Sequence, residues 1–442
     1  MFSNKTLRNM IVPLVVEQVL VMLVGIMDTG MISYVGEAAI SGVALIDMIN
    51  YLVTTVLAAV DTGGAVIVSQ YLGRKDREGA NESASQLVSV SVVFSLALAV
   101  LCILFHRLIL GALFGAVAED VMQAAVTYFL ITAMSFPFLG LYNSSAALFR
   151  TMKKTKITMY VSLLMNLINV IGNTIGIFVL YAGVAGVAVP TLISRAMAAA
   201  IMFFLILRKE NELSVSWKKI LRWNPVQVLN ILKIAVPNGI ENGLFALGKV
   251  LVTSIVALFG TSQIAANGVA NSIDQIAILV VSAINLAILP IVGQCVGAGA
   301  YDEATRYTRK LMGISYISTG LLSLLVAAIL PFVLNFYDLT PETRVLSIQL
   351  IMAHNIMAFA LHPTSFNLAN SLRASGDVRI TMYIGIGSML LFRLGTAYVC
   401  GVVLGLGIYG VWAAMGMDWL ARSAAFCLRW KSGKWKEIRV IS

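Results

Sequence analysis

Long apolar runs, separated by short polar segments, follow one another along most of the chain. Each run is about as long as the ~20 residues that a helix needs to cross ~30 Å of hydrocarbon. The runs predict about twelve spans, at residues 10–35, 47–72, 87–114, 120–147, 157–181, 184–207, 228–259, 271–297, 310–336, 343–371, 380–404 and 407–428. Because backbone N–H and C=O groups in lipid must be hydrogen-bonded within the protein, we expect an all-α polytopic membrane fold.

One long polar stretch, from Arg208 to Pro225, separates two sets of six spans. Its charged residues and its two tryptophans are typical of a segment at the membrane surface. We therefore predict an N-terminal six-helix lobe at residues 1–207, a cytoplasmic linker at 208–227, a C-terminal six-helix lobe at 228–430 and a cytoplasmic tail at 431–442.

The two sets of spans are related by an internal repeat. An offset of 224 residues pairs Pro13 with Pro237, Glu17 with Glu241, Gly36 with Gly260, Gln70 with Gln294 and Gly186 with Gly410, and an offset of 223 pairs Arg150 with Arg373. Because each copy holds an even number of spans, both copies enter the membrane in the same direction, as two parallel lobes do. A substrate cleft between the two lobes is the expectation that follows.

Composition and charge narrow the class of protein further. Of the 442 residues, 59% are hydrophobic and 12% charged, against about 25% charged in soluble domains, so a water-soluble fold is excluded. Lys and Arg collect at the termini and on alternate loops, whereas the opposite loops hold only Arg107 and Arg344. This asymmetry predicts a multi-pass protein of the plasma (inner) membrane with both termini cytoplasmic. The net charge of +10 therefore does not indicate a nucleic-acid partner.

A few acidic residues lie inside the predicted spans. An ionised carboxylate near the bilayer centre costs at least about 2.5 kcal/mol, so such acids are functional candidates. Asp28 and Asp61 are the leading candidates for an ion or proton site, with Glu17 and Glu241 as secondary ones. Glu17 precedes Asp28 by 11 residues, about three helical turns, and shares its face. A helix-end or structural hydrogen bond is the alternative role for each acid.

Other polar residues accompany these acids. Asn169 and Asn173 are one i, i+4 step apart, so their amides share a helix face and line a cavity or join helices. Lys249, in the seventh span, is expected to pair with Glu241 or with Asp28. His362, in the tenth span, is of a residue type that titrates near neutral pH, and no bound transition metal is expected there.

Several short segments resemble the multidrug and toxin extrusion (MATE) family over nearly the whole chain. They are residues 24–29 (VGIMDT) at the end of the first span, Gln70 and Gly73 before a basic loop, residues 148–150 (LFR) with 372–377 (LRASGD), and residues 183–186 (GVAG). The resemblance implies that Asp28 is the main coupling acid, in a site with Asn169, Asn173 and Thr191. Asn173 stands where many members have aspartate. Asn271 fits sodium-type members, and His362 replaces an acid of the C-terminal lobe, which favours coupling in the N-terminal lobe.

From these residues and this resemblance we predict a secondary antiporter. It exports amphipathic, cationic drugs or toxins in exchange for H+ or Na+ bound at Asp28, by alternating access. We expect a monomer in membrane lipid, with no cofactor besides the coupling ion. The alternative is a flippase for a lipid-linked saccharide or precursor, which predicts more basic residues along the substrate path. An enzyme is not expected, because the chain contains no HExxH, no GxSxG and no paired aspartates in a span.

Overall fold

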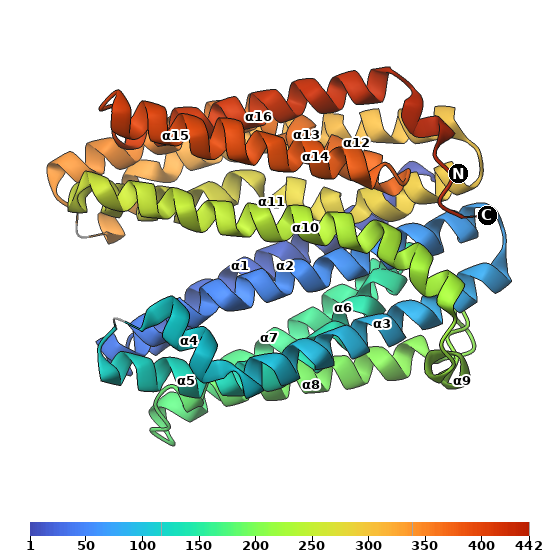
Figure 1. Ribbon diagram of the computed structural model, residues 1–442, viewed down its shortest axis with the longest axis horizontal. Coiled ribbons are helices and arrows are strands. Elements are labelled where there is room, and N and C mark those ends of the chain that lie inside the picture. The colour runs from blue at the N-terminus through green and yellow to red at the C-terminus, as the bar shows by residue number, and fades with distance from the viewer. Residues whose placement is uncertain (116, 338, 442) are drawn as a thin grey trace. The chain divides into compact units, whose positions relative to one another are not determined.

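Helices follow nearly every apolar run in the part of the chain that the computed structural model describes, residues 1–115, 117–337 and 339–441. The first half contains α1 (Asn4–Ile32), α2 (Glu37–Gly73), α3 (Arg77–Leu104), α4 (His106–Phe114), α5 (Glu119–Met134), α6 (Phe136–Thr151), α7 (Thr155–Phe178), α8 (Ala185–Ile206) and α9 (Trp217–Leu221) (Figure 1). The second half contains α10 (Pro225–Val256), α11 (Thr261–Gly297), α12 (Tyr301–Val333), α13 (Pro341–Ala374), α14 (Val378–Ser388), α15 (Thr396–Tyr398) and α16 (Ile408–Lys431).

Ten helices of the described chain are long and apolar enough to cross a membrane, or eleven when the bent pair α5 and α6 counts as one span. Helix α16, with 24 residues, is also long enough, but it is less apolar because it carries Asp418 and Arg422, which pair with each other at 2.9 Å. With α16 the total reaches the predicted twelve, and the all-α polytopic fold is confirmed.

The chain divides into two compact units, one of residues Phe2–Gly239 and the other of Ile240 onward together with Met1. In the N-terminal unit α7 packs against α1 and α8, and α2 packs against α3 and α5. In the C-terminal unit α11 packs against α12 and α13, and α13 packs against α16. The lobe and linker limits expected from the sequence stay a prediction.

Element boundaries show the internal repeat directly. Helix α2 and helix α11 both have 37 residues, and their first and last residues are each 224 positions apart. Each is preceded by a glycine with positive φ, Gly36 at 127° and Gly260 at 90°. Only glycine adopts such a backbone at little cost, so the same turn is conserved between the two halves of this chain.

Two elements differ between the copies. Helices α5 and α6 meet at an angle of 45°, whereas their counterpart α13 is one helix of 34 residues. Helix α7 is regular, whereas its counterpart, from α14 to Val403, contains π-helical turns at Met389–Gly395 and Val399–Val403. Such turns insert residues into a helix and often occur at functional sites.

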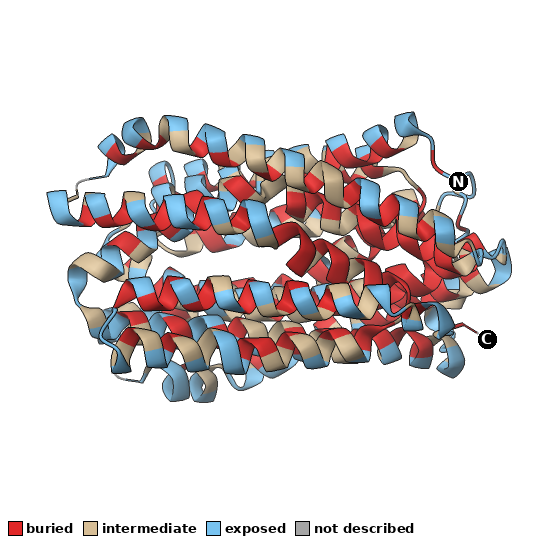
Figure 2. Cartoon of the chain, turned by 90° about the horizontal axis from the view of Figure 1, so that it is seen from above, coloured by how far each residue is buried: buried red, intermediate tan, exposed pale blue. Residues whose placement is uncertain are grey.

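Helix α7 buries its polar residues and exposes its apolar ones, the opposite of a helix in a soluble protein. Asn166, Asn169 and Asn173 are buried, whereas Leu167 and Ile171 are about half exposed. Exposed and buried residues alternate along most helices, as Figure 2 shows. An apolar exterior around a polar interior is stable when the solvent is lipid, because the polar side chains then find their hydrogen-bond partners inside the protein.

The polar segment between α8 and α10 is docked on α3. The Gln86 side chain donates hydrogen bonds of 2.8 Å to the carbonyl oxygens of Lys219 and Arg222, and Lys219 lies 3.2 Å from Glu82. These contacts attach α9 to the N-terminal unit. The orientation of this segment toward the cytoplasm stays a prediction.

Helices α7 and α8 approach each other closely at two glycines. A Cβ atom built on Gly176 would lie 2.3 Å from the carbonyl oxygen of Gly186, which real contacts do not allow. The repeat reproduces this contact, since a Cβ atom on Gly410 would lie 2.5 Å from the backbone of Cys400.

We therefore expect Gly176→Ala to force α7 and α8 apart and to lower the free energy of unfolding by about 1–3 kcal/mol. Thermal unfolding of the purified protein measures this loss. Gly111→Ala is the matched control, because a Cβ atom there meets no atom within 4 Å. Equal melting temperatures for the two variants would contradict the packing argument.

Candidate functional site

Asp28 lies at one end of a hydrogen-bonded chain that joins α1, α7 and α8. The Nδ2 atom of Asn173 donates to Oδ1 of Asp28 at 2.7 Å and lies 3.4 Å from Oδ1 of Asn169. Asn169 in turn donates to the Thr191 hydroxyl at 3.0 Å. The four residues predicted as the cation-coupling site are therefore brought together, and their role in coupling stays a prediction.

Local sequence explains how these groups meet. Asn169 and Asn173 project from one face of α7, one turn apart, and the glycine contact between α7 and α8 brings Thr191 within reach. Thr191 also donates to the Val187 carbonyl at 2.9 Å, which holds its hydroxyl oxygen toward Asn169. Three helices thus fix the surroundings of one carboxylate.

Further charged residues surround Asp28 that the sequence did not assign to the site. Its carboxylate interacts electrostatically with Asp47 on α2 and with Arg195 on α8. Tyr128 on α5 is 3.5 Å from Asp47, and Arg195 donates to Ser135 at 2.7 Å. From the sequence, Asp47 and Arg195 could be recognised only as charged residues inside apolar spans. That position alone does not reveal that both lie near Asp28.

The cluster has the ligand types that a small cation requires. Asn173 is 0% exposed, and its Oδ1 atom accepts no hydrogen bond. A buried carbonyl oxygen without a donor is costly unless a cation or a proton donor satisfies it. Together with the Asp28 carboxylate, it offers oxygen atoms to Na+, or an acceptor for a proton.

Glu17 and Asp61 belong to a separate cluster. Glu17 lies 11 residues before Asp28 on α1, about 16 Å along the helix. Its carboxylate is 2.7 Å from Arg150 and accepts a 2.9 Å hydrogen bond from Thr158. Asp61 accepts from Ser91 at 3.2 Å and interacts electrostatically with Arg150. Glu17 and Asp28 therefore share one face of α1 but have different neighbours.

The C-terminal unit repeats this ion pair. Glu241, the counterpart of Glu17, lies 2.7 Å from Arg373, the counterpart of Arg150. Both glutamates are about 95% buried. A buried acid with an arginine at hydrogen-bond distance is the arrangement of a structural ion pair, which accords with the alternative role given to both acids.

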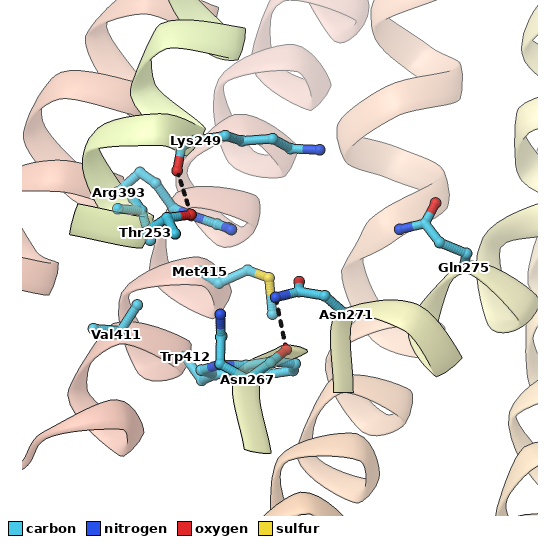
Figure 3. Close-up of a pocket in the computed structure, with 10 residues that line it drawn as sticks. Lys249, Thr253, Asn267, Asn271, Gln275, Arg393, Val411, Trp412 and Met415 are labelled. Atoms are coloured by element: carbon cyan, nitrogen blue, oxygen red, sulfur yellow. Dashed lines mark hydrogen bonds between the residues drawn. The ribbon is translucent and has the colours of Figure 1, made fainter. Parts of the chain in front are cut away.

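Lys249 and Asn271 line a cavity of about 280 Å³ within the C-terminal unit. Arg393 from the π-helical turn, Gln275 from α11, and Trp412 and Met415 from α16 complete much of its wall. In Figure 3 the polar ends of Lys249, Asn271, Gln275 and Arg393 point into the same space. Arg393 and Gln275 were not among the residues predicted to form a site.

His362 lies among aromatic rings. It stacks on Phe366 with ring centroids 4.3 Å apart and meets the edge of Trp419 at 5.0 Å. Its side chain is 5% exposed. These contacts give His362 a packing role in the C-terminal unit, and its predicted part in coupling stays a prediction.

Comparisons with known proteins agree with the repeat and with the fold. The MatE family model matches residues 13–175 and 237–399, two segments that are again 224 positions apart. The chain is 28% identical over 431 residues to the uncharacterised transporter YisQ of Bacillus subtilis, covering 96% of this chain and 93% of YisQ. It is 24% identical over 446 residues to the probable multidrug resistance protein NorM of Thermotoga maritima, covering 99% and 94%.

Solved structures share the architecture. A MOP superfamily transporter from Pyrococcus furiosus, whose binding pocket has reverse polarity, matches with a TM-score of 0.90 at 17% identity, over 98% of this chain and 97% of that chain. At this identity the likeness shows the fold.

Proposed function

The chain belongs to the MatE family of multidrug efflux transporters, and from this premise we propose that it is a secondary antiporter that exports amphipathic compounds in exchange for H+ or Na+. The observation that carries the proposal is the contact of 2.7 Å between Asp28 and Asn173 inside the N-terminal unit. No cofactor other than the coupling ion is part of the proposal.

Asp28 is the group on which the ion acts. When H+ or Na+ binds its carboxylate, the negative charge that holds the Asn173 amide is neutralised, which weakens a charge-assisted hydrogen bond. Hydrogen bonds connect Asn173 to Asn169 and Asn169 to Thr191, so a change in charge at Asp28 affects α7 and α8. Small shifts of packed helices of this kind convert ion binding into a change of conformation.

Exchange follows from reciprocity. If the conformation that binds the ion differs from the one that binds the exported compound, each weakens the affinity for the other by the same factor. Alternating exposure of the binding site to the two sides of the membrane then makes ion entry drive compound export.

Gradient-driven efflux from reconstituted vesicles tests the proposal. Vesicles that contain the intact protein and a fluorescent organic cation are given either a pH gradient or a Na+ gradient, and release of the dye is followed. We expect one of the two gradients to drive release well above that of protein-free vesicles, and to identify the coupling ion.

Collapsing that gradient with an ionophore selective for the same ion should stop the release. If neither gradient moves the dye while the same protein exchanges a lipid-linked saccharide precursor between leaflets, the antiporter proposal fails and the flippase takes its place.

A further inference from the structure

The cavity in the C-terminal unit is the repeat counterpart of the Asp28 site. At the offset of 224, Asp28 corresponds to Val252, Asn169 to Arg393 and Thr191 to Met415, and all three counterparts line the cavity. Asp47 corresponds to Asn271, which also lines it. The two copies have thus kept the location of a site and exchanged its chemistry.

The charge of the site is reversed between the copies. In the N-terminal unit two acids, Asp28 and Asp47, lie near one cation, Arg195. In the C-terminal unit the charged residues that line the cavity are Lys249 and Arg393. The acid that interacts with Arg393 is Asp418, which lies 2.9 Å from Arg422, so these three residues together keep one positive charge and Lys249 adds a second.

Both cations lie well inside candidate membrane spans. Lys249 is ten residues before the end of its span at Phe259, and Arg393 is ten before the end of its span at Val403, about 15 Å in each case. A Cβ atom on Gly401 would lie 3.0 Å from the Phe259 ring, so these ends are neighbours. Lysine and arginine at this depth are costly unless they face a polar cavity or a partner.

The cavity provides hydrogen-bond donors for an anion. The Nε atom of Arg393 is buried and has no hydrogen-bond partner. The amides of Asn271 and Gln275 point toward the same space as the Lys249 ammonium (Figure 3). The Nδ2 atom of Asn271 donates one of its two N–H groups to the Asn267 carbonyl oxygen at 2.8 Å, which leaves the second for a ligand. A guanidinium matches the geometry of a carboxylate or phosphate, and an ammonium adds a compact charge.

We propose that this cavity binds an anionic group, a carboxylate or a phosphate, carried by the compound that the protein exports. The volume of about 280 Å³ suits such a group with a short apolar neighbour, and Trp412 and Met415 supply the apolar wall. The inference rests on the proposed function only in the statement that the bound compound is exported. The exported compounds then include amphipaths that carry an anionic group, in addition to the organic cation of the efflux assay.

Equilibrium binding of matched fluorescent probes tests this site. The protein in nanodiscs of neutral lipid is titrated with dansylglycine, which carries a carboxylate, with the neutral dansylglycinamide, and with the cationic dansylcadaverine. We expect dansylglycine to bind about tenfold more tightly than the amide. Lys249→Met should remove about that tenfold preference, and Lys249→Arg should retain it.

Two further variants separate the site from general effects. Lys233→Met removes a positive charge from an exposed position on the same helix, outside the cavity, and should leave all three affinities unchanged. Lys249→Glu should favour dansylcadaverine over dansylglycine. Equal affinity of the intact protein for the acid and the amide, or the tightest binding by dansylcadaverine, would overturn the proposal.

The source of the anion and the transport proposal are tested separately. If phosphatidylglycerol in the nanodiscs displaces dansylglycine from the intact protein but not from the Lys249→Met variant, the anionic group is a lipid headgroup. If it does not, the group belongs to a soluble amphipath, and both results uphold the anion site. Because no ion gradient is present, binding by a protein that fails in the efflux assay would sink the antiporter proposal and leave the site standing.

Discussion

Asp28→Asn is expected to reduce ion-driven efflux to the leak rate of protein-free vesicles. The amide neither releases a proton nor carries the charge that attracts Na+. Its oxygen still accepts the hydrogen bond from Asn173, so the surrounding helices keep their packing. The measurement is dye efflux under the driving gradient, together with the melting temperature, which should be unchanged.

Asp120→Asn is the matched control for this variant. Asp120 is exposed in the first turn of α5 and accepts a 2.8 Å hydrogen bond from the backbone of Val121, which asparagine retains. Its efflux should equal that of the intact protein. Full activity of Asp28→Asn would remove Asp28 from coupling and direct attention to the buried Asp61.

Arg150→Met is expected to cause the largest loss of stability. It removes the only arginine within hydrogen-bond distance of Glu17 in the described structure, and that carboxylate is 5% exposed. An uncompensated buried charge costs about 3–5 kcal/mol. For a unit of this size, a loss of that order corresponds to a melting temperature lower by roughly 10 °C.

A second variant distinguishes a broken ion pair from lost packing. Glu17→Gln combined with Arg150→Met leaves no unpaired charge at this pair, so it should recover part of the lost melting temperature. Recovery is partial because Asp61 also interacts with Arg150. Arg208→Met, at an exposed position after α8, should melt like the intact protein. A double variant that is no more stable than Arg150→Met alone would contradict the ion-pair argument.

The spans and the repeat were predictable because they depend on properties that are local in the sequence. A run of about 20 apolar residues predicts a spanning helix whatever its neighbours are. In lipid the backbone N–H and C=O groups must be hydrogen-bonded within the protein, and a helix achieves this within one segment. The repeat followed from residue identities such as Gly36 with Gly260. The bend between α5 and α6 and the π-helical turns around Arg393 were not predicted, because both arise from packing within each unit.

The candidate site was predictable in part. The resemblance to a family placed Asp28, Asn169, Asn173 and Thr191 together, and their hydrogen bonds now join them. Periodicity along α1 put Glu17 on the same face as Asp28 but did not reveal that Arg150, 133 positions later, pairs with Glu17. From the sequence, Arg150 could be recognised only as the repeat counterpart of Arg373 and as part of a family segment, with no indication of its partner.

The sequence by itself determined the all-helical membrane fold and the two related halves, and it made Asp28 the leading candidate for an ion-binding acid. Only the tertiary structure decided which charges meet, and it placed Lys249 beside Arg393 at the location that mirrors the Asp28 site. The physical reason is that hydropathy acts residue by residue along the chain. The partner of a charge depends instead on how helices distant in sequence pack. Packing brought Lys249 and Arg393 to one cavity, and the residue differences between the two copies set its polarity.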